Sequence, residues 1–241
     1  MKILVVGGGG REHAIVWKIA QSPKVDKIYC APGNGGIAEL AECVDIAATD
    51  IENMVKFAKD NAIDLVMVAP DDPLVLGMVD AMEKEGIRAF GPRANAAIIE
   101  GSKAFSKELM KKYNIPTANY EVFTDSTSAI DYIKAQNTFP TVIKADGLAL
   151  GKGVIIAQNL EEAEQAVREM IDDGKFGKSG SRVVIEEFLT GPEVSVLAFT
   201  DGKTVKPMVS AQDHKRAYDN DEGLNTGGMG TFSPSLSLIH I

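Results

Sequence analysis

Lysine and glycine residues between positions 141 and 154 are of the types that bind phosphate. The segment reads TVIKADGLALGKGV, in which a short β-rich run reaches Lys144. The loop that follows contains Gly147, Gly151, Lys152 and Gly153. Glycine amides can close over phosphate oxygens without side chains in the way. The commonest phosphate-loop pattern, G-x-x-x-x-G-K-[ST], is absent, because Asp146 takes its first glycine position and Gly153 its hydroxyl position. The segment therefore predicts a nucleoside triphosphate loop of another kind.

Acidic residues at the end of a later strand could bind the rest of such a nucleotide. Glu186 and Glu187 end a β-rich run, and Glu193 follows the next turn. Carboxylates there could accept hydrogen bonds from an adenine amine and from ribose hydroxyls, while Lys103 and Lys144 are candidates for the phosphates. A solvated strand end is the simpler interpretation of the acidic pair alone. Together with the glycine loop, the pair favours a nucleotide site.

The first turn of the chain, GGGGREHA from Gly7 to Ala14, is a second candidate anion site. It fails the dinucleotide fingerprint, because Glu12 or His13 takes the place of the third glycine and no acidic residue ends the second strand. The loop still leads into a helix, so its amides and Arg11 suit a phosphate. A tight turn alone would need only one or two of these glycines.

Charged residues and glycines gather once more near the end of the sequence. Asp213, His214, Lys215 and Arg216 are consecutive, and Thr226 to Gly230 form a further expected glycine loop. A charge run by itself is usually a solvated face, but this combination indicates a loop built around anions. Nothing in the sequence shows that His13 or His214 is catalytic.

Two different arrangements of elements must position these residues. Short apolar runs at 2–6, 27–30, 43–46, 65–68 and 88–90 alternate with helical patterns such as 50–62, capped by Thr49 and Glu52, and 74–84. This alternation predicts a doubly wound parallel sheet that ends near Gly101. The following segment predicts a compact α+β unit, with a helix capped by Ser102, a helix from Ser128 and a helix over 160–172 capped by Asn159. It also predicts a pair of strands at 182–189 and 193–200.

Composition limits the class of protein. The 241 residues carry a formal net charge of −9, which argues against general binding to nucleic acid or to an anionic membrane. Cys30 and Cys43 lack metal-type spacing and suit a reducing compartment, and no long apolar span or cleavable signal pattern is present. We expect a cytoplasmic protein whose anionic ligands are held by local basic clusters.

The ordered motifs resemble those of the phosphoribosylamine–glycine ligase family, within the ATP-grasp superfamily. They are GGGGREHA, APGNGG, FGP, EGSKAF, IPTANY, VIKADGLALGKGV, VIEEFLTGPEVS, SAQDHKR and NTGGMGTFSP. The resemblance covers residues 1 to about 234 and is highly specific. Two departures stand out: the family commonly has Asn at Gly8 and a glutamate where this sequence has Asp71 or Asp72. A shorter carboxylate at Asp71 leaves its contact with substrate open.

This resemblance implies a reaction and a role for each motif. Glycine would attack the γ-phosphate of ATP to give glycyl phosphate, and the amine of 5-phosphoribosylamine would then displace phosphate. ATP would be held by Lys103, Lys144, Gly151, Lys152, Gly153, Glu186, Glu187, Leu189 and Glu193. Phosphoribosylamine would be held by Gly9, Gly10, Arg11, Glu12, Gly33, Asn34 and Asp71. Glycine and the transferring phosphate would be surrounded by Asp213, His214, Lys215, Arg216, Thr226, Gly227 and Gly228.

The resemblance also implies a division of the chain. Residues 1–101 form an N-terminal substrate-binding α/β domain, 102–122 a connecting helix and strand, and 123–193 the ATP-grasp lid subdomain, whose loop must move to admit ATP. Residues 194–234 begin an incomplete C-terminal ATP-grasp subdomain. Family members continue further and bind Mg²⁺ or Mn²⁺ there, so the sequence holds none of those metal ligands.

We interpret residues 235–241, which read SLSLIHI, as an artefactual tail. We also expect no measurable ligase activity from these 241 residues. A short paralogue that binds ATP without ligation, or another ATP-grasp carboxylate–amine ligase, such as one acting on formate or bicarbonate, are the alternatives. The sequence leaves the oligomeric state open.

Overall fold

The chain forms two compact units, Met1–Glu187 and Phe188–Ile241. The structure, a computed structural model, describes residues 1–148 and 153–235. No helix in these two ranges is long and apolar enough to cross a membrane.

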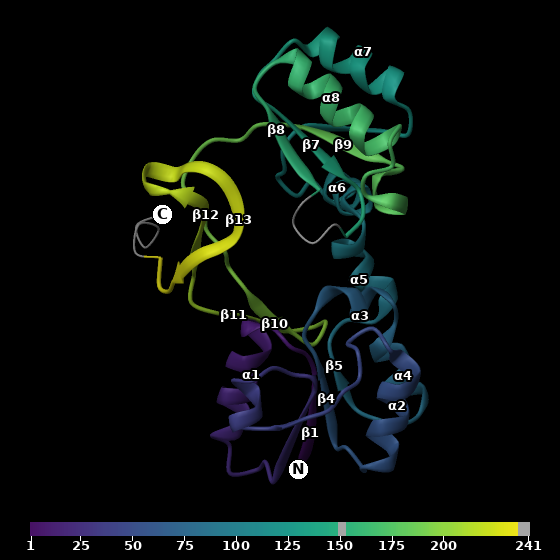
Figure 1. The fold of residues 1–241 in the computed structure, drawn as a ribbon, viewed down its shortest axis with the longest axis vertical. Helices are drawn as coiled ribbons and strands as arrows, with labels where there is room; N and C mark the ends of the chain where they lie inside the picture. The colour runs from purple at the N-terminus through teal and green to yellow at the C-terminus, as the bar shows by residue number, and fades with distance from the viewer. Residues whose placement is uncertain (149–152, 236–241) are drawn as a thin grey trace. The chain divides into compact units, whose positions relative to one another are not determined.

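The first hundred residues fold into a five-stranded parallel sheet with helices on both faces (Figure 1). The strand order is β3-β2-β1-β4-β5. The strands are β1 (Lys2–Gly7), β2 (Lys27–Pro32), β3 (Glu42–Cys43), β4 (Leu65–Val68) and β5 (Ala89–Phe90). The helices are α1 (Gly10–Ala20), α2 (Ile51–Asp60), α3 (Asp71–Val75) and α4 (Met78–Lys84), with a 3-10 turn η1 (Ile37–Glu39). The predicted doubly wound sheet is confirmed.

Strand β1 shows why both faces are covered. Its side chains alternate, so that Ile3 and Val5 pack against Val16 of α1, whereas Leu4 and Val6 pack in the cluster that holds residues of α2 and α4. A strand that is buried on both faces reads as a continuous apolar run, as the first strand does here.

Three local predictions in this sheet and its helices were wrong. The helix predicted over 74–84 is interrupted at Gly77, whose φ of +90° is a left-handed conformation that glycine adopts without steric cost. Helix α2 is capped by Asp50, whose carboxylate accepts a hydrogen bond from the Asn53 amide at 3.2 Å, and not by Thr49. The third strand is the two-residue edge strand β3, which ends where the predicted run 43–46 begins.

The rest of the first unit is a four-stranded antiparallel sheet with two helices on one face (Figure 1). Helices α5 (Ala94–Gly101) and α6 (Lys103–Lys112) lead into it. The sheet order is β6-β9-β7-β8, and its elements are β6 (Tyr120–Phe123), α7 (Ser126–Gln136), β7 (Thr141–Ala145), β8 (Val154–Ala157), α8 (Leu160–Ile171), the 3-10 turn η2 (Gly177–Gly180) and β9 (Val183–Glu187). Alternation along β7 and β9 sends Ile143 and Ile185 to the face covered by α7 and α8, and Lys144 and Glu186 to the other.

The helix starts in this region were predicted with mixed success. Ser102 caps α6 by accepting a hydrogen bond from the Phe105 amide, and Asn159 caps α8 by accepting one from the Glu162 amide, both as predicted. Helix α7 starts two residues before the predicted Ser128, because the side chain of Asp125 accepts a hydrogen bond from the Ser128 amide at 2.8 Å.

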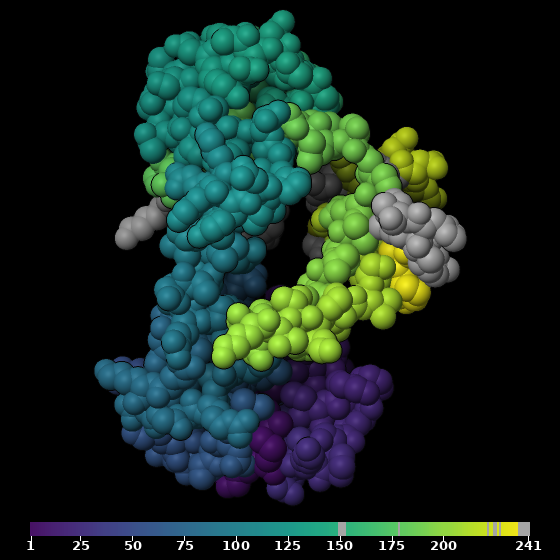
Figure 2. Space-filling model, turned by 180° about the vertical axis from the view of Figure 1, so that it is seen from behind, coloured from purple at the N-terminus to yellow at the C-terminus, as the bar shows by residue number. Residues whose placement is uncertain are grey.

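The second unit consists of two small antiparallel ribbons. Its elements are β10 (Ala198–Thr200) paired with β11 (Val205–Pro207), and β12 (Gln212–Tyr218) paired with β13 (Glu222–Phe232), with a 3-10 turn η3 (Asp219–Asp221) between the last two. In the space-filling view this unit is a thin band of chain with most of its side chains exposed (Figure 2).

Two predictions about this region were wrong. The runs at 182–189 and 193–200 do not pair with each other, since β9 pairs with β6 and β7, while β10 pairs with β11. Residues 226–230 are part of strand β13 rather than a loop, because their backbone continues the antiparallel pairing with β12.

Candidate functional site

A buried carboxylate between two lysines lies on the face of the antiparallel sheet that α7 and α8 leave uncovered. Glu186 is 6% exposed, and its Oε2 lies 2.9 Å from Lys144 Nζ and 3.1 Å from Lys107 Nζ. Strand register explains the first contact, since Val142 faces Glu186 across β7 and β9, which makes Lys144 the diagonal neighbour of Glu186 on the same face. One carboxylate cannot neutralise two ammonium groups, so the cluster keeps excess positive charge.

Lys107 is the member of this cluster that the sequence did not predict. It is 8% exposed, and its ammonium also donates to Thr117 Oγ1 at 2.7 Å and to the Ala118 carbonyl at 3.3 Å. Its signal in the sequence is the spacing from Lys103, because residues four apart lie on the same side of a helix. Since its donors are used, Lys107 holds Glu186 in place and leaves Lys144 as the more accessible cation of the pair.

Lys103 belongs to the same electrostatic neighbourhood. Its Nζ donates to the Gly147 carbonyl at 3.0 Å, directly after strand β7. Burial lowers the pKa of Lys103, opposed by the charges of Asp146 and Glu100, and the positive charge of Lys144 lowers it further. The predicted phosphate lysines 103 and 144 are therefore brought together. The predicted Gly151 and Lys152 lie outside the described residues, and Gly153 directly precedes β8.

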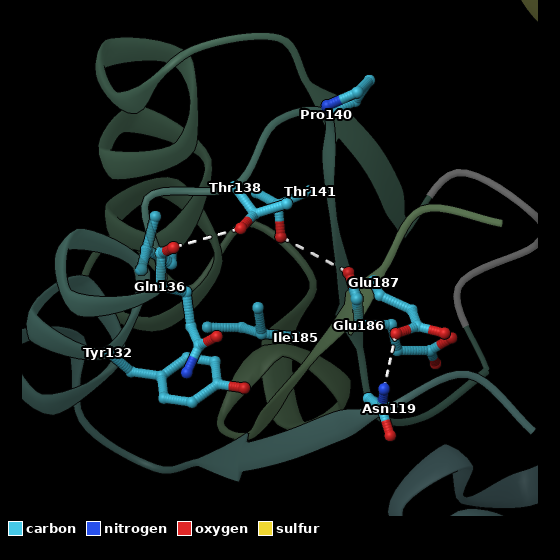
Figure 3. A pocket seen from close by; sticks show the side chains of 10 residues that line it. Asn119, Tyr132, Gln136, Thr138, Pro140, Thr141, Ile185, Glu186 and Glu187 are labelled. Atoms are coloured by element: carbon cyan, nitrogen blue, oxygen red, sulfur yellow. Dashed lines mark hydrogen bonds between the residues drawn. The ribbon is translucent and has the colours of Figure 1, made fainter.

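Glu187 is placed differently from its neighbour Glu186. It follows Ile185 by two residues, and its Oε2 accepts a hydrogen bond from Asn119 Nδ2 at 2.6 Å. Both residues line a small pocket of about 160 Å³ between the end of the sheet and α7, together with Tyr132 and Gln136 (Figure 3). Ile185 is packed on the helix-covered face, opposite to Lys144, so this enclosed pocket is not the space that the phosphate lysines face. The proposed adenine contact of Glu187 thus has no support from its side-chain position.

The predicted substrate residues of the first domain gather at the carboxyl ends of β1, β2 and β4. All strands are parallel, but the chain adds β2 and β3 on one side of β1 and then β4 and β5 on the other. Ligands of such sheets bind at this switch point between β1 and β4. The set comprises Gly9, Gly10, Arg11 and Glu12 after β1, Gly33 and Asn34 after β2, and Asp71 at the start of α3. Hydrogen bonds join these loops, from the Gly33 amide to the Gly7 carbonyl at 3.1 Å and from Asn34 Nδ2 to the Gly8 carbonyl at 2.9 Å.

Glu12 changes the chemistry expected of this loop. It is buried, and its Oε2 accepts a hydrogen bond from the Gly9 amide at 2.6 Å, so one of the amides predicted to bind phosphate is already used. Its Oε1 is buried without a hydrogen-bond partner and lies 3.4 Å from Arg11 Nε, and Arg11 Nη1 lies 4.0 Å from Asp71 Oδ1. The loop therefore offers an acceptor for a hydroxyl or amine next to the cationic Arg11.

Gly8, where the family commonly has Asn, lies close to the loop after β2. A Cβ at this position would lie 2.6 Å from the Gly33 carbonyl oxygen, which is closer than real Cβ contacts allow. The absence of a side chain at Gly8 thus permits the close approach of the two loops in this structure.

The charge run is organised by strand pairing within the second unit. Lys215 Nζ lies 2.5 Å from Glu193 Oε1 and 3.7 Å from Asp213 Oδ2, and the hydrogen bond to Glu193 raises the pKa of Lys215. Thr226 Oγ1 donates to the Lys215 carbonyl at 2.8 Å and accepts from the Gly228 amide at 3.0 Å. The pairing of β12 with β13 therefore brings most of the predicted glycine-site residues together.

Four further predicted residues of the second unit are placed as follows. Arg216 Nη1 donates to the Gly223 carbonyl at 2.6 Å, and the ring of His214 lies 5.7 Å from that of Phe232. Gly227 continues strand β13, and Leu189 is 62% exposed. No residue of this unit is assigned to adenine or to phosphate by its contacts within the unit.

A metal site is not found among the described residues. Over 1–148 and 153–235, no group of three or more His, Cys, Asp or Glu side chains could hold a metal ion. The donors present do not fit a resident divalent cation.

A doubly wound parallel sheet, followed by an antiparallel sheet that carries lysines around a buried carboxylate, is the arrangement of the ATP-grasp class of protein. The sequence matches the family described as "Phosphoribosylglycinamide synthetase, N domain" over residues 1–100 and the ATP-grasp (A) domain of the same synthetase over 101–239. The chain belongs to the phosphoribosylglycinamide synthetase family.

Individual relatives agree with this assignment. The chain is 56% identical over 234 residues to a phosphoribosylamine–glycine ligase of Halalkalibacterium halodurans, covering 97% of this chain and 54% of the relative. A crystal structure of phosphoribosylamine–glycine ligase from Thermotoga maritima superposes with a TM-score of 0.82 at 32% identity, covering 97% of this chain and 56% of that one. Biotin carboxylase from Campylobacter jejuni shares the fold, with a TM-score of 0.73, 15% identity and coverage of 89% and 51%. The chain spans about half the length of the curated relatives it matches.

Proposed function

We propose that the whole protein joins glycine to 5-phosphoribosylamine with ATP, giving glycinamide ribonucleotide, ADP and phosphate in purine biosynthesis. Membership of the synthetase family supports this activity. The observation that carries it is the cluster in which the buried Glu186 carboxylate is shared by Lys144 and Lys107, with Lys103 close by. Such excess positive charge in a chain with a net charge of −9 suits a polyphosphate.

The reaction has two steps. A carboxylate oxygen of glycine forms a bond to the γ-phosphorus of ATP as the bond to ADP breaks, which gives glycyl phosphate. The amine of phosphoribosylamine then forms a bond to the acyl carbon, the phosphate leaves, and the amine loses a proton. Positioning and charge neutralisation dominate such chemistry, so no nucleophilic side chain is needed.

The family resemblance suggests a role for each group of residues. Lys103 and Lys144 bind the phosphates, and Glu186 keeps Lys144 in position. Glu193 and Leu189 contact ribose and adenine. Asp71, Arg11 and Glu12, with the glycines and Asn34 around them, bind phosphoribosylamine, and the free Oε1 of Glu12 accepts a hydrogen bond from its hydroxyl or amine group. The residues between Asp213 and Gly228 surround glycine and the transferring phosphate.

A divalent cation, Mg²⁺ or Mn²⁺, is part of the chemistry of this family, and it would neutralise phosphate charge. Because the described residues do not fit such a cation, we derive no step through it. A cytoplasmic location suits the two free cysteines.

Nucleotide binding is tested with two lysine variants of the 241-residue chain. We expect Lys144→Gln to weaken binding of a non-hydrolysable ATP analogue by about tenfold, the size of one lost charge-assisted hydrogen bond. Lys134→Gln is the matched control, because Lys134 pairs with Glu164 on the surface of the same sheet's helices. Calorimetric titration that finds equal affinities for both variants and the unsubstituted chain would contradict a phosphate role for Lys144.

A second candidate function is nucleotide binding without ligation. The lysine cluster around Glu186 supports it as well, because it can hold phosphate without acting on glycine. The two functions are separated by glycine-dependent ADP formation in the presence of phosphoribosylamine, measured with a protein that spans the full length of the curated relatives. Binding of the ATP analogue with no such ADP formation would support the binding module.

A further inference from the structure

The carboxylate of Asp146 joins two elements that carry the phosphate lysines. Asp146 is buried directly after β7, two residues beyond Lys144. Its Oδ1 accepts a hydrogen bond from the Ala104 amide at 2.7 Å and from Ser102 Oγ at 3.1 Å. Its Oδ2 accepts one from Arg182 Nε at 2.9 Å and pairs with Arg182 Nη2. The end of β7 is thus tied to the first turn of α6 by one side chain.

The main chain repeats this connection around Lys103. The Lys103 amide donates to the Asp146 carbonyl at 3.0 Å, and its ammonium donates to the Gly147 carbonyl at 3.0 Å. The Asp146 amide donates to the Arg182 carbonyl at 3.0 Å, which anchors the same residue to the start of β9. The backbone amide and the side-chain ammonium of Lys103 are therefore both held by the segment that contains Asp146.

A structural cap alone does not account for the composition of this cluster. Ser102 accepts from the Phe105 amide and Asp146 from the Ala104 amide, so both side chains satisfy free amides in the first turn of α6, but this capping needs no surrounding cations. Four cationic side chains lie around two buried carboxylates, namely Lys103, Lys107, Lys144 and Arg182 around Asp146 and Glu186. The main chain of Asp146 accepts from the Lys103 amide, and Asp146 follows Lys144 by two residues, so the fixed position of Asp146 holds Lys103 near the end of the strand that carries Lys144.

We propose that Asp146, held by Ser102 and Arg182, is a positioning residue that places Lys103 beside Lys144 for binding the phosphates of ATP. This inference rests on the proposed function and extends it to three residues without an assigned role. Asp146 acts through Lys103, so removing either residue removes the same interaction with phosphate.

The test is a double-mutant cycle on the 241-residue chain, with the affinity for a non-hydrolysable ATP analogue measured by calorimetry. We expect Asp146→Asn and Lys103→Gln each to weaken binding by about tenfold. The double variant should also bind about tenfold more weakly than the unsubstituted chain, because the effects of two coupled residues on the binding free energy do not add. Additive losses, about a hundredfold in the double variant, would overturn the proposal. Asp172→Asn is the matched control, since it removes the carboxylate charge from a surface ion pair between Asp172 and Arg168.

A nucleotide-free measurement separates this proposal from the proposed function. Hydrogen exchange of Asp146→Asn should be faster for amides 103–105 and 145–147 together, with α8 unchanged. Unchanged exchange in both segments would overturn the positioning role, whether or not the chain binds ATP. If the unsubstituted chain binds no ATP analogue, the proposed function fails, and the exchange result still decides the role of Asp146. Should Asp146→Asn not fold, Arg182→Gln removes the cation from Asp146 and leaves the Ser102 cap of α6 in place, and the same two outcomes apply to it.

Discussion

At the scale of single residues, this molecule depends on a few titratable side chains that the fold has moved away from water. Glu186 and Asp146 are buried carboxylates, and each is stabilised by cations within hydrogen-bond distance. Lys103 is half-buried and has no carboxylate in direct contact, so burial lowers its pKa. Because its pKa is lowered, Lys103 loses its charge at a lower pH than an ordinary lysine.

The lowered pKa of Lys103 predicts that ATP binding depends on pH. Phosphate favours the charged lysine, so the pKa of Lys103 is higher in the complex than in the free chain, and binding takes up protons between the two values. Affinity should therefore fall as the pH rises through the lowered pKa of the free chain, below the pH at which an ordinary lysine loses its proton. Calorimetric titration of an ATP analogue between neutral and alkaline pH measures this fall.

Arginine in place of Lys103 is the control for that experiment. The Lys103→Arg variant stays charged over the whole range, so its affinity should change less with pH. Identical pH profiles of the variant and the unsubstituted chain would assign the fall to another group.

The two cysteines predict a clear difference in reactivity. Cys30 is fully buried, its Sγ lies 3.3 Å from the Gly7 carbonyl, and burial raises the pKa of its thiol to about 12. Cys43 is exposed. Because the thiolate is the reactive form, we expect one alkylated cysteine per native chain at mildly alkaline pH, and none in Cys43→Ser. Mass spectrometry that finds two modified cysteines in the folded chain would show that Cys30 is accessible.

At the scale of secondary structure, capping side chains and strand alternation decide where the elements begin and which face they bury. Ser102 and Asn159 were predicted as caps and confirmed, because each directly precedes a helical pattern, and Asn159 also has Glu162 in the first turn of its helix. Asp50 and Asp125 were missed, since neighbouring Thr49 and Ser128 were equally good candidates in sequence and only the backbone conformation selects between them. Errors of one or two residues at helix ends follow from this ambiguity.

Asn159 predicts a measurable loss of stability when its side chain is removed. Its Oδ1 accepts a hydrogen bond from the Glu162 amide at 3.0 Å, while Glu162 Oε2 accepts one from the Gln158 amide at 2.8 Å. We expect Asn159→Ala to lower the free energy of unfolding by about 1 kcal/mol, as for other helix caps. Urea denaturation measures the loss. Gln165→Ala, an exposed change on the same helix, is the control, and an equal effect of both would rule out a capping origin.

At the scale of the whole molecule, the two units differ in how well they bury apolar side chains. The first unit has three clusters of buried residues, on both faces of its parallel sheet and on one face of its antiparallel sheet. The second unit exposes many of its large apolar side chains, among them Leu189, Val196, Leu197, Phe199, Val205, Val209 and Met229. Two-stranded ribbons without such a core are marginally stable in water.

This exposed apolar surface predicts dye binding and self-association of the 241-residue chain. We expect enhanced fluorescence of an apolar dye at native pH, because a region with many exposed large apolar side chains offers such a dye apolar surface to bind. The combined replacement of Val196, Leu197 and Val209 by threonine should reduce the signal. Trp17 and Leu76 are exposed singly in the first unit, and their replacement is the control. An equal decrease from both sets would place the dye elsewhere.

Apolar periodicity, glycine and capping residues predict the order of the elements, and the ordered motifs predict the family and the candidate site residues, because all of these are local signals in the sequence. Only the tertiary structure decided how these residues meet. Asp146 contacts Ser102 and Arg182 across 44 and 36 residues of sequence, and Lys107 reaches Glu186 through the packing of α6 on the sheet. The opposite placement of Glu186 and Glu187 likewise depends on strand register, since one residue of shift would exchange their faces. Contacts of this kind depend on how distant elements pack, and no local pattern in the sequence records that packing.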